Sequence, residues 1–68
     1  MTVEQRVAMF LRTHQQRDFC DDCTAREVGI NRHQARNATS ALGATRDFDR
    51  DDRTCSRCGH TKRVVMAL

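Results

Sequence analysis

Two pairs of cysteines are the residues of this 68-residue sequence whose types and spacing best support a chemical function. Cys20 and Cys23 form one C-x2-C clip, and Cys55 and Cys58 form another after residues 24–54. Each clip points two sulfurs at one spot, so four thiolates can surround one Zn²⁺ ion tetrahedrally. Four sulfur ligands leave no open position for water. We therefore predict one structural zinc ion held by all four cysteines, and no enzymatic activity.

The residues after the second clip extend this pattern. Gly59 can adopt a positive φ, which lets backbone N–H groups turn back towards the sulfurs. The run C-x-x-C-G-x-x-K, from Cys55 to Lys62, resembles a zinc knuckle. The two clips are also similar to those of rubredoxin, which holds iron for electron transfer. The chain departs from rubredoxin in having no proline, tyrosine or tryptophan. Structural disulfides and a redox switch are further alternatives.

Size and composition favour a metal-stabilised domain. Only 38% of the residues are hydrophobic, and so short a chain buries little apolar surface without a disulfide, a metal or a partner. The first residues lack the pattern of a signal peptide, and no apolar run is long enough to span a membrane. We expect a cytoplasmic protein with no membrane partner and no small-molecule substrate. In a reducing compartment, paired cysteines hold metal more often than they form disulfides.

The net charge of +3 counts the cysteines as neutral thiols. Four thiolates with one Zn²⁺ carry −4 + 2 = −2, which brings the metal-loaded protein to +3 − 2 = +1. Attraction to nucleic acid therefore depends on where the charges lie rather than on their sum.

The sequence pattern predicts a single α+β domain over residues 1–68. Three capping boxes start three helices, in which a polar residue and a residue three positions later exchange hydrogen bonds. The boxes are Thr2 with Gln5, Thr24 with Glu27, and Asn31 with Gln34. The helices are expected at about 3–15, 24–29 and 32–42, and the last one stops at Gly43. Two antiparallel strands, about 45–53 and 61–67, form a hairpin. Which of Val64 and Val65 points inward is left open.

The second and third helices have the spacing of a helix-turn-helix. Ala25 and Ala35 are small enough for two helices to cross closely, and Gly29 permits a sharp turn between them. With a helix before it and a hairpin after it, this unit resembles a winged helix-turn-helix domain. Residues 24–36 are similar to small regulators of the fimbrial-operon type. The tetracysteine site is not part of that pattern and is expected to be an added clamp.

The resemblance implies sequence-specific binding of double-stranded DNA, and a role in transcription regulation. In such domains the second helix of the motif enters the major groove, and residues near its start reach the bases. Carried onto this chain, the DNA-contacting residues are Asn31, Arg32, His33, Arg36, Asn37 and Ser40. No acidic residue lies between Val28 and Arg46, and a second acid-free basic run spans Arg53 to Arg63.

An acidic segment supports a different function. Asp47, Asp49, Asp51 and Asp52 fall in the first strand and its continuation, where a DNA-binding wing carries basic residues. The alternative is therefore a protein-interaction adaptor on the same zinc-stabilised fold, which contacts its partner through this hairpin. One recognition helix covers only a few base pairs, so specific DNA binding requires a dimer or a second protein.

Overall fold

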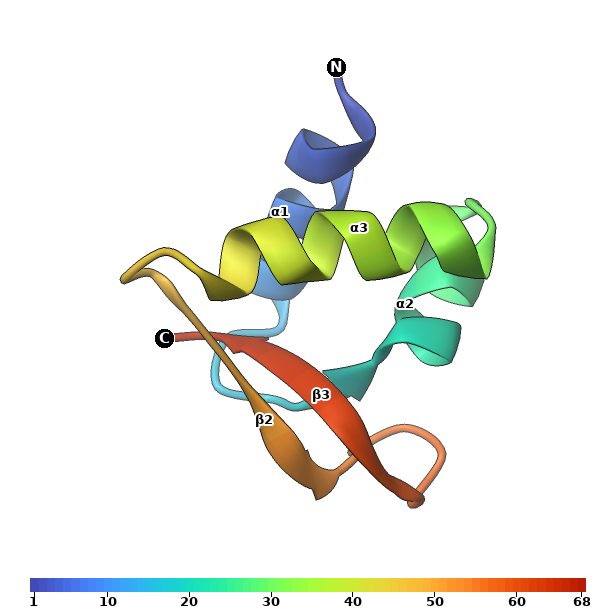
Figure 1. The fold of residues 1–68 in the computed structure, drawn as a ribbon, viewed down its shortest axis with the longest axis vertical. Helices are drawn as coiled ribbons and strands as arrows, with labels where there is room; N and C mark the ends of the chain where they lie inside the picture. The colour runs from blue at the N-terminus through green and yellow to red at the C-terminus, as the bar shows by residue number, and fades with distance from the viewer.

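The computed structural model describes residues 1–68 as three helices and one three-stranded antiparallel sheet (Figure 1). The helices are α1 (Val3–Thr13), α2 (Asp21–Val28) and α3 (Arg32–Gly43). The strands are β1 (Phe19–Cys20), β2 (Phe48–Thr54) and β3 (Thr61–Ala67). The α+β class is confirmed, and β2 and β3 pair as a hairpin, but the prediction of only two strands is wrong because β1 joins the sheet. Strand β2 also starts at Phe48 rather than at about residue 45, because residues 45–47 form the turn that follows α3. None of the helices has the length and apolarity needed to cross a membrane.

Helix α1 begins where the sequence predicts and ends earlier. The Thr2 side chain accepts the Gln5 N–H at 3.1 Å, and the Gln5 side chain accepts the Thr2 N–H at 2.9 Å. The helix ends at Thr13, two residues before the expected boundary. Gln16 then takes a left-handed conformation with φ 63°, which turns the chain towards the sheet. Its N–H donates to the Ala67 carbonyl at 2.8 Å.

Helix α2 begins three residues before the predicted start. Cys20 is its N-cap, and the Cys20 Sγ accepts the Cys23 N–H at 3.5 Å. Thr24 is fully buried inside the helix, so the expected capping box of Thr24 with Glu27 is wrong. The physical reason is that the first clip already supplies a side chain that accepts a hydrogen bond at the helix N-terminus.

Helix α3 carries the predicted capping box of Asn31 and Gln34 and includes Gly43 as its last residue. Gly43 is needed for packing rather than for a left-handed turn. A Cβ placed on it would lie 2.7 Å from the Cβ of Arg50 in β2. The turn between α2 and α3 is made by Gly29, whose φ is 80°. Ala25 and Ala35 are buried, as the helix crossing predicted.

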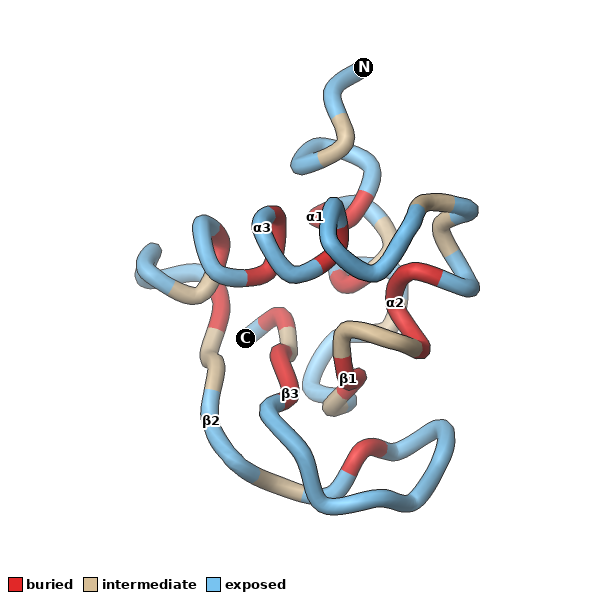
Figure 2. Tube along the Cα trace, turned by 45° about the vertical axis from the view of Figure 1, so that its right-hand side comes forward, coloured by how far each residue is buried: buried red, intermediate tan, exposed pale blue.

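The sheet has the order β1-β3-β2, with β3 in the centre. In Figures 1 and 2 the helices lie on one side of it, and the main core lies between the two layers. Val65 pairs with Phe19 on one side and Arg50 on the other. The main core, between the helices and the sheet, contains Val7, Ala8, Leu11, Phe19, Ala38, Leu42, Phe48, Val65 and Ala67.

Both central valines are fully buried, which answers the question that the sequence left open. Successive residues of a strand point to opposite faces. Val65 belongs to the main core, and Val64 packs in a second cluster with Cys20, Cys23 and Cys55. The cysteine site is therefore built against the sheet on its own small apolar base.

Candidate metal centre and adjoining basic cleft

The four cysteine sulfurs come together where β1 meets α2 and where the loop after β2 folds back. All four Sγ atoms lie within 4.8 Å of one another. The Sγ atoms of Cys20 and Cys58 are 3.8 Å apart, and those of Cys23 and Cys55 are 3.7 Å apart. Sulfurs at tetrahedral corners about 2.3 Å from a central ion are about 3.8 Å from each other. The cluster could therefore hold one metal ion. No disulfide joins the cysteines.

The second clip is closed by its own backbone. The Cys55 N–H donates to the His60 carbonyl at 2.9 Å, and the Gly59 N–H donates to the Cys55 carbonyl at 3.0 Å. Gly59 has φ 77°, the left-handed conformation expected from the sequence. This turn presents both sulfurs of the clip on one side.

Backbone N–H groups act on the sulfur of Cys55. It accepts the Cys20 N–H at 3.3 Å and the Arg57 N–H at 3.4 Å. Burial by itself raises the pKa of Cys55, but hydrogen bonds from the backbone of Cys58, Cys20 and Arg57 outweigh it and lower this pKa to about 6. Burial raises the pKa of Cys20 and of Cys23. The lowered pKa favours the thiolate form of Cys55, the form that ligates a metal, and the raised pKa values of Cys20 and Cys23 favour their thiol forms.

Asp18 joins the two clips, and the sequence analysis missed this role. Its carbonyl accepts the Ser56 N–H at 2.8 Å and the Ser56 Oγ at 2.7 Å. Its carboxylate accepts hydrogen bonds from two nitrogens of Arg53, Nη2 at 2.9 Å and Nε at 3.2 Å. Asp18 and Arg53 each lie two positions before the first cysteine of their clip. That matched placement of opposite charges is the signal that could have identified them.

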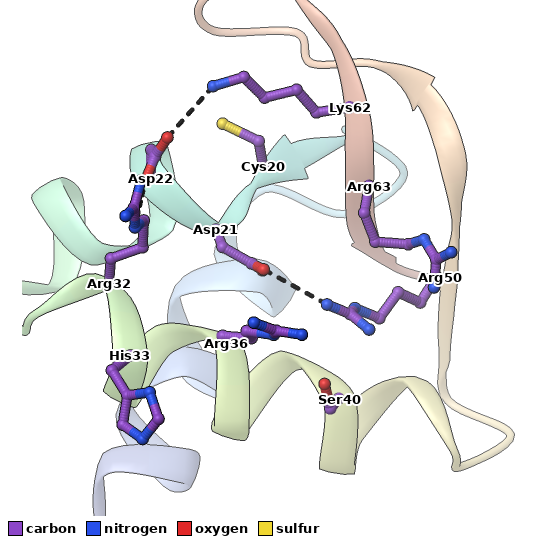
Figure 3. A pocket seen from close by; sticks show the side chains of 10 residues that line it. All are labelled: Cys20, Asp21, Asp22, Arg32, His33, Arg36, Ser40, Arg50, Lys62 and Arg63. Atoms are coloured by element: carbon purple, nitrogen blue, oxygen red, sulfur yellow. Dashed lines mark hydrogen bonds and ion pairs between the residues drawn. The ribbon is translucent and has the colours of Figure 1, made fainter.

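A basic cleft of about 550 Å³ adjoins the metal centre (Figure 3). It lies between the exposed side of α3, the first turn of α2 and the β2–β3 hairpin. The lining residues are Cys20, Asp21, Asp22, Arg32, His33, Arg36, Ser40, Arg50, Lys62 and Arg63. Four arginines and one lysine thus face two carboxylates around one hollow.

The two carboxylates of the cleft hold cations from three different elements. Asp22 accepts from Lys62 of β3 at 3.1 Å and pairs with Arg32 of α3 at 3.6 Å. The hydrogen bond to Asp22 raises the pKa of Lys62, which keeps this side chain charged.

Asp21 is bound on both sides by neighbouring elements. It pairs with Arg50 of β2 at 3.3 Å and accepts the Thr39 Oγ1 of α3 at 2.7 Å. The first turn of α2 therefore ties α3 to both strands of the hairpin. Thr39 is fully buried, unlike the predicted DNA-contacting residues of α3.

The predicted DNA-contacting residues are all exposed, but the structure does not bring all of them together. Arg32, His33, Arg36 and Ser40 line the cleft. The Asn31 side chain instead accepts the Gln34 N–H at 2.8 Å, as a helix cap. Asn37 lies on the side of α3 that faces the start of α1. The sequence analysis did not connect Arg50, Lys62 and Arg63 with α3, because only the folded hairpin brings them there.

The acidic hairpin is partly neutralised within the protein. Asp49 pairs with Arg53 at 2.9 Å, and Asp52 pairs with Arg63 at 2.9 Å. The Asp51 carboxylate accepts the Asp52 N–H at 2.8 Å. The hairpin therefore presents less free negative charge than its sequence indicates.

The chain combines a tetracysteine cluster with a cleft of mostly positive charge, and the two share Cys20. Comparison with protein-family models, with curated proteins and with solved structures finds no match to this chain.

Proposed function

We propose that this protein is a zinc-stabilised winged helix-turn-helix domain that binds double-stranded DNA through α3 and regulates transcription. The observation that carries the proposal is the basic cleft, in which cations of α3 and of β3 surround one exposed hollow. Phosphate neutralisation by lysine and arginine supplies most of the affinity of proteins for DNA. A surface on which an exposed helix and a basic strand adjoin suits that partner.

The packing of α2 against α3 supports the helix-turn-helix assignment. Ala25 and Ala35 are buried at the crossing, and Gly29 makes the turn in a left-handed conformation. Exposed positions run along one side of α3 (Figure 2), and its first turn contains no acidic residue. This is the geometry that a helix needs to enter a major groove about 12 Å wide. In this interpretation β2 and β3 form the wing.

Zinc is the metal that best fits the proposed structural role. Four thiolates form a closed tetrahedral set, and the sulfur separations of 3.7 and 3.8 Å agree with such a set. The cluster fastens the two-residue strand β1 and the start of α2 to the loop after β2. Metal analysis of the purified protein, with its visible absorption spectrum, separates this zinc site from a coloured iron site.

The charge distribution supports DNA over the adaptor alternative. Two of the four hairpin carboxylates are paired with arginines of the same hairpin, which reduces the acidic surface available to a basic partner. On the cleft side, Arg36 has no carboxylate partner. Arg36 is therefore a positive charge of the cleft that no carboxylate pairs with.

The experiment is a titration of zinc-loaded, isotope-labelled protein with mixed-sequence duplex DNA at low salt. We expect amide shifts on residues 31–40 and 62–63 that weaken as salt is raised, because phosphate contacts release counterions. Asp51→Lys is the variant that alters the acidic hairpin, since Asp51 is in none of the ion pairs of the structure. Absence of shifts at low salt, where non-specific binding is strongest, would refute DNA binding. A pull-down with wild type and Asp51→Lys would then test the adaptor function.

A further inference from the structure

We infer that the inner part of the basic cleft is a seat for a single phosphate group, formed by Arg36, Ser40 and Arg50. This inference rests on the proposed DNA binding and deepens it. It changes the expected role of two residues of α3. Arg36 and Ser40 would contact the DNA backbone, and Arg32 and His33 would remain to contact base edges.

Some charges of the cleft are paired within the protein and one is not. Asp22 is engaged by Lys62 and Arg32, and Asp21 is engaged by Arg50 and the Thr39 hydroxyl. No carboxylate of the cleft remains for Arg36. An exposed guanidinium without an acidic partner, beside a second guanidinium, is a site where an anion is favoured.

The side chains of Arg36, Ser40 and Arg50 lie around the same part of the cleft. Figure 3 shows the guanidinium groups of Arg36 and Arg50 pointing into the same part of the hollow from α3 and from β2. Ser40 lies one helical turn after Arg36, on the same side of α3, and its hydroxyl is exposed at the cleft. Two guanidinium groups and a hydroxyl offer several N–H and O–H donors, the set that phosphate oxygens accept.

Arg50 is held in place by its neighbours. Its side chain is 17% exposed, and its Nη2 donates to Asp21 at 3.3 Å. Gly43 leaves room for the stem of this side chain, because any Cβ there would contact it at 2.7 to 3.0 Å. The Arg50 Nε is buried without a hydrogen-bond partner, so Asp21 does not use the whole guanidinium. A fixed cation of this kind loses little conformational entropy when an anion arrives.

The lining of the cleft favours a phosphate over a base or an apolar ligand. Only one of its ten lining residues, Cys20, is hydrophobic, and none is a phenylalanine, tyrosine or tryptophan. Nucleobases bound outside a duplex stack on aromatic or guanidinium planes within largely apolar pockets. In protein–DNA complexes, phosphate contacts fix register and orientation, and base contacts determine sequence preference. The seat would therefore position a DNA strand across α3 and β2.

The test is fluorescence anisotropy of labelled duplexes from 50 to 200 mM salt, with wild type, Arg36→Ala, Arg36→Lys, Ser40→Ala and Arg17→Ala. Arg17 is a control arginine outside the cleft, in the segment before β1. Loss of one phosphate contact lowers the slope of log affinity against log salt by about 0.9. Raising the salt fourfold should therefore weaken the DNA affinity of Arg36→Ala by a factor about 3.5-fold smaller than the factor for wild type. We expect Arg36→Lys to keep the slope, because it keeps the charge.

Two results would overturn the inference while leaving DNA binding intact. In one, Arg36→Ala has the salt slope of Arg17→Ala. In the other, Arg36→Ala changes the preferred DNA sequence, which would make Arg36 a base-contacting residue.

A second arm titrates inorganic phosphate into labelled protein and follows the amides of Arg36 and Ser40 and the Arg50 Nε–H. Saturable shifts that are confined to these groups and absent in Arg36→Ala would support the seat. If wild type shows these shifts but binds no duplex, the proposed function fails, and the occupant of the seat is a free phosphorylated ligand. Uniform or absent shifts together with unaltered salt slopes would refute it.

Discussion

Removal of the metal from the four-cysteine cluster should unfold this domain. The unfolded 7.8 kDa chain exposes about 11,300 Å², and the folded chain exposes 4313 Å². About 60% of the surface is thus buried, the proportion found in marginally stable small domains. At about 0.05–0.15 kcal/mol per residue, a chain of 68 residues reaches a free energy of unfolding of about 3–10 kcal/mol. Binding of a structural zinc ion supplies about 10–16 kcal/mol, which equals or exceeds that total.

The assay is urea unfolding at a series of buffered free zinc concentrations, followed by helical circular dichroism and by amide dispersion. A single site that exists only in the folded state adds about 1.4 kcal/mol to the free energy of unfolding for each tenfold rise in free zinc above the dissociation constant. We expect that slope, and an apo protein with collapsed amide dispersion. A free energy of unfolding that does not change with zinc, or an apo protein with native dispersion, would refute the reasoning.

Cys58→Ser is the matched control for this measurement. Cys58 is exposed, whereas Cys20, Cys23 and Cys55 are buried, so its replacement removes a ligand without creating a core cavity. The variant should need higher free zinc to reach the same stability. If it unfolds at the same urea concentration as wild type at every zinc concentration, Cys58 is not a ligand.

Three further substitutions test how the surroundings of the site are built. Gly43→Ala should lower the melting temperature, because the new Cβ would lie 2.7 Å from Arg50. That contact costs about 1–3 kcal/mol, which outweighs a gain of up to about 1 kcal/mol in helix propensity. A raised melting temperature would show that Arg50 does not pack against Gly43. Val64→Ala should lower the free energy of unfolding of the zinc-loaded protein in urea by about 2 kcal/mol, because this fully buried side chain supports the cysteines, and an unchanged urea midpoint would contradict that support. Asp18→Asn should cost about 1 kcal/mol in the same assay, since Asp18 and Arg53 are 22% and 32% exposed and solvent weakens their pairing; a loss that disappears in an Arg53→Ala background would assign the effect to this ion pair.

The parts of the fold that depend on neighbouring residues were predictable. The capping boxes at Thr2 and Asn31 start helices where expected, and strand β3 has the predicted bounds, because these signals involve residues a few positions apart. The cysteine spacing predicted which side chains meet, since each C-x2-C clip fixes two sulfurs locally.

Strand β1 could not be predicted from its own sequence. It contains only Phe19 and Cys20, too few residues for an alternating pattern, and it is a strand only because Val64 and Val65 of β3 pair with it. The early start of α2 follows from the same event, because the clip that enters from β1 supplies the helix cap. Both features depend on contacts between residues far apart in the chain.

The basic cleft shows how a long-range contact alters the interpretation of local charge. In the sequence, Asp21 and Asp22 are two negative charges within the first cysteine clip. In the fold, they pair with Arg50, Lys62 and Arg32 and hold these cations around one hollow. Because Cys20, Asp21 and Asp22 are consecutive, any displacement of the first clip also displaces the carboxylates that position the cleft. The cysteine cluster and the cleft are therefore connected through one helical turn rather than built as two independent parts of the fold.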